Sequence, residues 1–172
     1  YPIIGLMSGT SMDGINAILV YTNGTKLKST SFNLIRDYSK KTQLILNKAL
    51  ENIQLYTNNS DFKHKLDKLI TKDHYKAIKE LIKKSLIIPE FIGFHGQTIF
   101  HNSQKKISIQ AGDAELLANL LNIKVISNFR DRDLKFGGEG APISPIYHKY
   151  LMENLKLKLP SCFINVGGIA NL

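Results

Sequence analysis

The chain has 172 residues, of which 43% are hydrophobic, and this is enough to bury the core of one ordinary domain. Its net charge of +9 comes mostly from lysines spread along the chain, and the two lysine clusters, at residues 63–84 and 149–158, have helical apolar spacing that favours solvated helix faces over nucleic-acid binding. The single cysteine, Cys162, excludes an internal disulfide and suits a reducing cytosol, and no apolar run approaches the roughly 20 residues that cross a bilayer.

The first two apolar runs, residues 2–7 and 15–21, predict buried strands joined by a polar turn at residues 8–14. The first run is short and lacks a basic leader, so it does not resemble a signal peptide, and we expect a cytoplasmic protein. Glycines in the turn let the backbone approach an anion, to which amides and hydroxyls can donate, and Asp13 offers a hard oxygen for Mg²⁺. A plain polar β-turn is an equally good interpretation of this segment taken alone.

An Asn23-Gly24 pair predicts a type I′ turn into a third strand at residues 27–35, which completes an antiparallel meander of three strands. Helical spacing then predicts a helix over about 40–55 and a longer amphipathic stretch from 62 to 82. We expect residues 71–73 to break that stretch into two helices, the second of them capped by Asp73.

Strands and helices alternate in the second half of the chain. In order, we expect a strand at 91–94 ending at His95, a strand at 106–110, a helix at 114–121, a strand at 123–126, a glycine-rich loop at 128–145, a helix at about 146–154 and a strand at 161–165. This order argues for an α/β fold with a mixed sheet. Pro160 is interpreted as a boundary between a first domain over residues 1–159 and the start of a second over 160–172.

Four polar loops that contain glycine follow or interrupt these strands, at residues 8–14, 95–98, 128–142 and 165–171. Binding sites in α/β proteins gather at strand ends, so the four together are more informative than any one of them. None is a Walker A loop, because the sequence has no Gly-Lys-Ser/Thr.

The loop at residues 128–142 carries the most varied chemistry. Arg130 can bind a carboxylate or a phosphate, and a neighbouring aspartate, Asp131 or Asp133, could be a general base. A surface ion pair is the simpler alternative, although it does not explain the adjoining glycines. The segment His-Gly-Gln-Thr could orient sugar hydroxyls or a phosphate. On its own, however, it is better interpreted as a loop whose histidine makes its hydrogen bonds within the protein.

Five motifs in this order resemble the anhydro-N-acetylmuramic acid kinase family: GLMSGTSMDG, HGQT, QAGDAELLA, FRDRD followed by GGEGAP, and NVGGIAN. The resemblance covers the whole chain but only about the N-terminal half of a family member. The family belongs to the superfamily of actin, hexokinase and heat-shock chaperones. The resemblance therefore implies a ribonuclease H-like (actin-like ATPase) lobe with a mixed sheet, followed by the opening strand and glycine turn of a truncated second lobe.

The resemblance also implies a reaction, in which ATP phosphorylates O6 of 1,6-anhydro-N-acetylmuramic acid while water opens the anhydro bridge, giving N-acetylmuramic acid 6-phosphate in peptidoglycan recycling. It implies ATP and Mg²⁺ as cofactors and a homodimer, with no nucleic acid or membrane partner. Matching positions imply a catalytic base at Asp133, sugar contacts at His95, Gln97, Thr98 and Arg130, a metal ligand at Asp13, and phosphate contacts at Gly9, Thr10, Ser11, Met12, Asp13, Gly14, Ile15, Asn16, Gly167 and Gly168.

Two positions depart from the family pattern, since Asn16 and Asn128 stand where family members usually carry Asp. Each removes a negative charge near the expected site, which could weaken metal binding or alter the pKa of the base. Without the second lobe we expect this polypeptide to be inactive alone. The alternatives are a decayed or split half-enzyme that acts as a binding partner, a kinase of the same superfamily with another substrate, and a nucleic-acid-binding protein.

Overall fold

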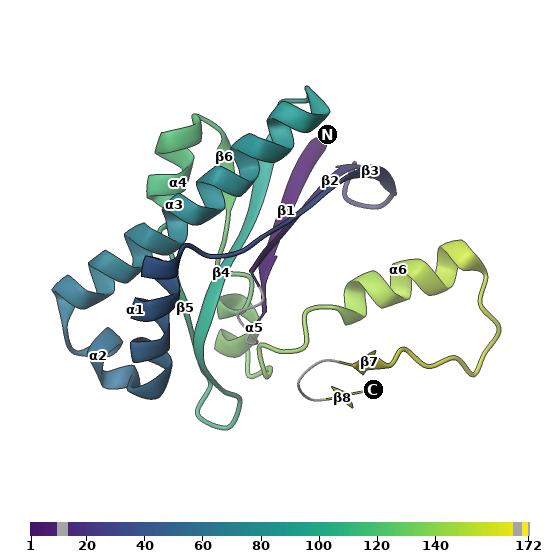
Figure 1. The fold of residues 1–172 in the computed structure, drawn as a ribbon. Coiled ribbons are helices and arrows are strands. Elements are labelled where there is room, and N and C mark those ends of the chain that lie inside the picture. Colours follow the sequence, from purple (N-terminus) through teal and green to yellow (C-terminus); the bar gives the residue numbers. More distant parts are fainter. Residues whose placement is uncertain (10–13, 167–169, 172) are drawn as a thin grey trace.

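The computed structural model describes residues 1–9, 14–166 and 170–171, and it is built around one mixed β-sheet (Figure 1). Three strands, β1 (Pro2–Ser8), β2 (Ile15–Thr22) and β3 (Leu27–Arg36), form the expected antiparallel meander. The strand order is β3-β2-β1-β4-β5, and β6 also pairs with β4. Because β4 (Phe91–Asn102) runs parallel to β1 and to β6 (Lys124–Ile126) but antiparallel to β5 (Ile107–Ala111), the predicted mixed sheet is confirmed.

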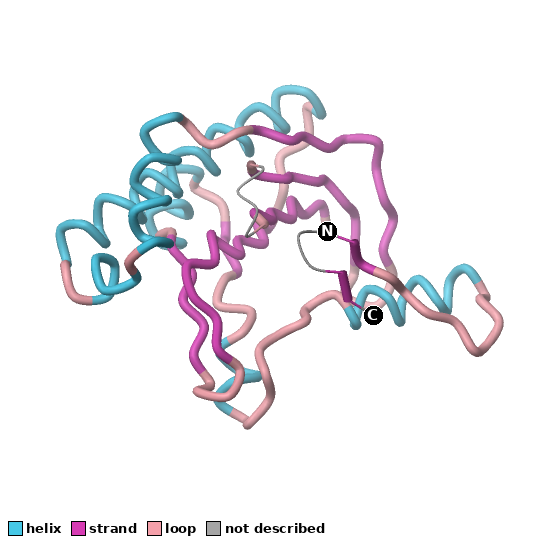
Figure 2. The backbone as a smooth tube through the Cα atoms, turned by 60° about the horizontal axis from the view of Figure 1, so that its bottom comes forward, coloured by secondary structure: helices cyan, strands magenta, loops and turns pink. Residues whose placement is uncertain are grey.

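Four helices lie together beside the sheet: α1 (Lys40–Glu51), α2 (Ile53–Thr57), α3 (Ser60–Ser85) and α4 (Ala114–Leu121). Two more, α5 (Asp131–Lys135) and α6 (Pro145–Leu155), follow β6, and α6 lies apart from that helical layer (Figure 2). Beyond it, β7 (Asn165–Val166) pairs with β8 (Ala170–Asn171). None of the helices in the described ranges is long and apolar enough to cross a membrane.

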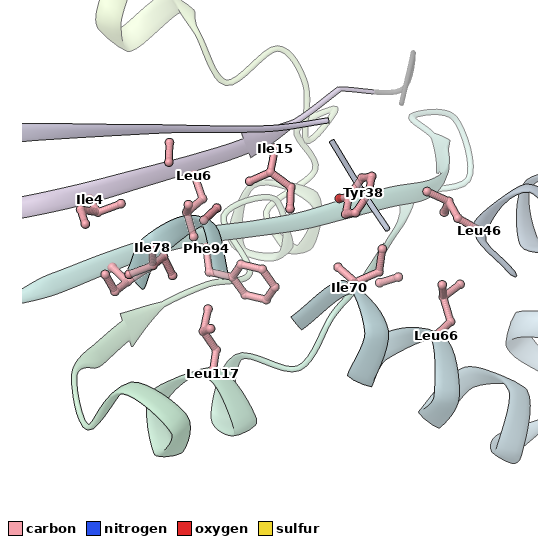
Figure 3. Packing of buried hydrophobic residues seen from close by; sticks show 14 of the residues in the cluster. Ile4, Leu6, Ile15, Tyr38, Leu46, Leu66, Ile70, Ile78, Phe94 and Leu117 are labelled. Carbon is pink, nitrogen blue, oxygen red and sulfur yellow. The ribbon is translucent and has the colours of Figure 1, made fainter. Parts of the chain in front are cut away.

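The core lies between the sheet and α3 (Figure 3). The strands alternate, so that Ile4, Leu6 and Ile15 point into it, and α3 contributes Ile70 and Ile78. Burying side chains of this size contributes about 1.5–3 kcal/mol each, which explains why the apolar runs at residues 2–7 and 15–21 were a sound guide to the sheet.

The expected break at residues 71–73 is wrong, because α3 is continuous from Ser60 to Ser85. Asp73 is buried inside it, and its carboxylate accepts hydrogen bonds from Ser39 N (3.0 Å) and Thr42 Oγ1 (2.6 Å) at the start of α1. Thr71 Oγ1 accepts from Asp113 N (2.8 Å) ahead of α4. The polar residues that suggested a break therefore tie α3 to the starts of two other helices.

Four other expectations are corrected. The hairpin at Asn23 forms, but only Gly24 of the pair has a positive φ, and Asn23 Oδ1 instead accepts from Thr25 N and Lys26 N, so the turn is not type I′. The helix expected over 40–55 is divided at Asn52, whose side chain accepts from Gln54 N and caps α2. Residues 161–164 form no strand. Residues 95–98 lie inside β4 and are not a loop.

Candidate active site

The expected loop at residues 95–98 is a bulge in β4. Leu6 pairs with Phe94 and Ser8 pairs with Gln97, so two residues of β4, His95 and Gly96, stand opposite one residue of β1. Gly96 has a φ of +70°, and a Cβ there would lie 2.6 Å from the carbonyl oxygen of Ala111. Glycine is therefore required at this point, and the bulge changes the directions of its neighbours' side chains.

His95 is buried at this bulge and binds Arg130. The Arg130 Nε–H donates to His95 Nε2 (3.1 Å), and because arginine only donates, Nε2 must be unprotonated and Nδ1 must carry the ring proton, which it gives to the Gly96 carbonyl (2.9 Å). Burial, with a further contribution from the Arg130 charge, lowers the pKa of His95. Burial also lowers the pKa of Arg130. The imidazole is thus a neutral acceptor that fixes the direction of a cation.

Arg130 is linked in turn to Asp133 through Gly140. Arg130 Nη1 donates to the Gly140 carbonyl (2.6 Å), and Gly140 N donates to Asp133 Oδ2 (2.7 Å). Gly138 N bonds to the Asp133 carbonyl (2.8 Å), and a Cβ on Gly138 would lie within 2.4 Å of the Asp133 carboxylate. Both Asp131 and Asp133 are exposed on α5, but it is the Asp133 carboxylate that the glycine loop holds through Gly140 N.

The described ends of the first glycine segment lie beside the bulge. Gly9 O accepts from Gln97 Nε2 (3.1 Å), and a Cβ on Gly14, whose φ is +114°, would lie 2.6 Å from the Arg36 carbonyl. Ile15 is a core residue and Asn16 is exposed on β2. Six predicted phosphate or metal contacts lie outside the described residues: Thr10, Ser11, Met12, Asp13, Gly167 and Gly168.

Gln97 and Thr98 face other protein groups. Gln97 is fully buried, and its Oε1 accepts from the Tyr38 hydroxyl (3.1 Å). Thr98 is half-buried, and its Oγ1 lies 3.5 Å from Gln110 Nε2. The structure brings His95, Arg130 and Asp133 into one connected group, and it places Gln97 in a second group with Gly9.

His95 lines two hollows. One, of about 540 Å³, is also lined by Met7, Phe129 and Arg130. The other, of about 510 Å³, is also lined by Gln110 and by Asp113, which caps α4. The first therefore offers an apolar wall beside a guanidinium, and the second offers mainly polar side chains.

Sequence reasoning missed several residues that support this site from elsewhere in the protein. Tyr38 gave no signal, because its buried hydroxyl cannot be recognised before the fold is known. Ser8 stood in the predicted polar turn as a possible ligand donor, but its hydroxyl donates to the Gly96 carbonyl (3.0 Å). Lys106 was also missed, although its Nζ donates to the carbonyls of Gly137 (2.8 Å) and Gly138 (2.9 Å). Gly140 lay within the glycine-rich motif and could have been singled out.

Comparison with known proteins identifies the family. The family model for anhydro-N-acetylmuramic acid kinase matches residues 1–172. Curated relatives of that description include proteins of Pelagibacter ubique (42% identical over 100% of this chain), Bradyrhizobium diazoefficiens (34% over 98%) and Brucella canis (36% over 98%). The matched segment is 47–48% of each relative, so the chain spans about half their length. The chain belongs to the anhydro-N-acetylmuramic acid kinase family.

Proposed function

We propose that this chain is the first lobe of an ATP-dependent kinase that converts 1,6-anhydro-N-acetylmuramic acid and water into N-acetylmuramic acid 6-phosphate. The observation that carries the proposal is the hydrogen-bonded connection from His95 through Arg130 and Gly140 to Asp133. It joins a cation for an anionic substrate group to a carboxylate that can act as a base, beside the glycine segment where a nucleotide would bind.

In this mechanism Asp133 takes a proton from water, whose oxygen forms a bond to C1 of the sugar. The bond from C1 to O6 breaks, O6 receives the γ-phosphoryl group of ATP, and ADP leaves. Asp133 Oδ2 is held by Gly140 N, so the carboxylate has a fixed direction before substrate binds. Asp131 has no such partner among the hydrogen bonds of the described residues, which supports Asp133 as the base.

We assign the sugar to the hollow of about 540 Å³. Phe129, 42% exposed, offers an apolar surface for one face of the pyranose ring, and Arg130 can pair with the lactyl carboxylate. Arg130 is held by a neutral imidazole and a carbonyl, and no carboxylate is among its hydrogen-bond partners in the described part of the chain, so its charge is available to an anionic substrate group.

The residues near the first glycine segment fit a nucleotide phosphate with Mg²⁺. The backbone at Gly14 admits no side chain, and residues 9–16 supply hydroxyls and one carboxylate, Asp13. Proteins usually bind Mg²⁺ through one or two carboxylates, and the phosphates of the substrate provide further oxygen ligands. Mg²⁺ would supply neutralisation of the charge on the transferred phosphoryl group, and Gly167 and Gly168 are proposed to approach the phosphate from the second lobe.

The test is expression of the complete open reading frame that contains this sequence, followed by measurement of ADP formation with and without the anhydro sugar. Sugar-dependent turnover with phosphate on O6 supports the proposal, whereas ATP turnover with other sugars alone would assign another substrate. Residues 1–172 expressed alone are expected to give no turnover, because the matched segment is 47–48% of the relatives. Gel filtration of the same protein tests the proposed homodimer, and cell fractionation tests the proposed cytoplasmic location.

A further inference from the structure

We propose that His95 and Gln97 are positioning residues, which hold the sugar-binding and nucleotide-binding segments at a fixed separation through the bulge in β4. This inference rests on the proposed function and changes the role of both residues, which the resemblance had implied to be sugar ligands. Two sets of hydrogen bonds start at the bulge. The Gln97 arm is the bond from Gln97 to Gly9 of the first glycine segment, and the His95 arm is the bond between His95 and Arg130.

The Gln97 arm is buried and its amide is already bonded. Gln97 is 0% exposed, and its Nε2 donates to the carbonyls of Gly9 (3.1 Å) and, more weakly, Thr98 (3.4 Å). Since a carbonyl only accepts, the Gly9 contact fixes which end of the amide is nitrogen, and Oε1 is left to accept from the Tyr38 hydroxyl (3.1 Å). The polar atoms of Gln97 are therefore used by the protein, and one of them holds the first residue of the predicted phosphate-binding segment.

The His95 arm has the same property. Both ring nitrogens are bonded, Nδ1 to the Gly96 carbonyl and Nε2 to Arg130, so neither is left to bind a sugar hydroxyl, and their polar effect on a bound sugar passes through Arg130. The imidazole is also only 8% exposed.

The two arms meet at one peptide group. The Gly96 carbonyl accepts from His95 Nδ1 (2.9 Å) and from Ser8 Oγ (3.0 Å), and Ser8 directly precedes Gly9. Gly96 has a positive φ, and any side chain there would meet the Ala111 carbonyl. The turn of the chain at this glycine lets the residues on its two sides, His95 and Gln97, support different segments. A kinase needs its phosphoryl donor and acceptor at a set distance, and this bulge connects the proposed sites for both.

The first test uses the complete protein with Gln97→Met and, as the matched control, Tyr38→Phe. Both variants remove a buried hydrogen bond at Gln97, but only Gln97→Met releases Gly9. We expect Gln97→Met to raise the KM for ATP about tenfold and to leave the KM for the sugar within about twofold, while Tyr38→Phe changes both by less than about twofold. An increase confined to the sugar KM would make Gln97 a sugar ligand and would overturn the inference, as would unchanged values of both.

Because Gln97→Met could prevent folding, Ser8→Ala provides a milder probe of the same connection. It removes the bond from Ser8 Oγ to the Gly96 carbonyl, together with the Ser8 contact to the Tyr38 hydroxyl that Tyr38→Phe tests separately. We expect it to raise the ATP KM about threefold without changing the sugar KM. Circular dichroism would confirm that Ser8→Ala is folded. An unchanged KM for ATP in the folded variant would contradict the role of the Gln97 arm.

The second test is a double-mutant cycle between His95→Phe and Arg130→Ala. If His95 acts through Arg130, His95→Phe raises the sugar KM in the wild-type background but has no further effect when Arg130 is absent. His95→Gln, which keeps an acceptor for Arg130, should restore part of the loss. Additive effects in the cycle would mean that His95 contacts the sugar directly, and would overturn this arm.

These results are separate from the test of the proposed function. If the wild-type complete protein shows no turnover with the anhydro sugar, the proposed function fails before any variant is compared. If the wild type is active and the variants behave otherwise than stated, only the positioning roles fail.

Discussion

His74 provides a test of the core through pH. The ring is 0% exposed, its Nδ1 lies 2.9 Å from the Ile70 carbonyl, and its Nε2 has no partner among the described residues. It packs edge-on against the Phe94 ring at 4.9 Å and lies 5.9 Å from the Tyr38 ring. Burial lowers the pKa of His74 from 6.5 to about 4, since a charged imidazolium would lose its water, and nearby Asp73 only partly offsets this while His95 adds to it.

The sign and size of the effect follow from proton linkage. Because the folded-state pKa is depressed, the unfolded chain binds the proton first, so stability is lost as pH falls from about 6.5 towards 4. With these two values, His74 lowers the free energy of unfolding by about 2 kcal/mol between pH 7.5 and 5.0. Asp73 does not contribute in this pH window. Burial raises its pKa, but the hydrogen bonds from Thr42 and Ser39 lower it by more, so the pKa lies below the ordinary 3.8.

The perturbation is His74→Leu, which removes the proton-binding group and the unpaired nitrogen together. At pH 7.5 we expect the free energy of unfolding to change by less than about 1 kcal/mol. Loss of the Nδ1 hydrogen bond destabilises the protein, whereas removal of the buried unpaired Nε2 stabilises it. At pH 5.0 the variant should have gained about 2 kcal/mol relative to wild type. Urea unfolding of both proteins at the two pH values measures the difference, and His101→Leu, at an exposed position, is the control. A difference that is the same at both pH values would refute the reasoning.

Three further predictions concern the complete protein. Asp133→Asn should lower kcat by at least about 100-fold, whereas Asp131→Asn should lower it less than about threefold, as measured by ADP release with the anhydro sugar. Lys106→Met should lower kcat several-fold without unfolding the protein, because an exposed side chain that holds two carbonyls of the Asp133 loop is lost; Lys105→Met is the matched control, and equal effects of the two would contradict the role of Lys106. Gly138→Ala should reduce activity about as much as Asp133→Asn, since its Cβ would displace the Asp133 carboxylate, and full activity would show that the loop adjusts.

The sheet could be predicted from the sequence because its signals are local. Short apolar runs such as residues 2–7 and 15–21 predict buried strands, and the meander follows from those two runs, the Asn23-Gly24 turn and the third strand. The long helix α3 was recognised by its apolar spacing, but its length was not, because Thr71 and Asp73 are typical of helix starts. Their hydrogen bonds to residues more than 30 positions away decide the matter, and no local pattern contains those partners.

The short helix α5 shows the same limit at the site. It has five residues and no side-chain hydrogen bond at its N-cap, Arg130, so the segment gave only the signals of a loop. The loop was nevertheless identified as the one with the most varied chemistry, because a surface ion pair among its arginine and aspartates does not explain the adjoining glycines. Its chemistry was evident from composition, and the resemblance implied Asp133 in place of Asp131. The bond from Gly140 N to Asp133 Oδ2, which supports that proposal, could not be foreseen from the sequence.

The segment His-Gly-Gln-Thr, at residues 95–98, shows why the partners of polar side chains are hard to predict. Taken alone it favoured a histidine bonded within its own loop, although a glycine admits a close neighbour and polar groups can bind it. The family resemblance implied instead that His95, Gln97 and Thr98 contact the sugar. In the structure that close neighbour is the Ala111 carbonyl, and the polar atoms of His95 and Gln97 bond to Arg130 and Gly9. A sequence states how many donors and acceptors a residue has but not which of them the protein itself uses. For a residue buried beside a site, that count decides whether it touches the substrate or holds the residue that does.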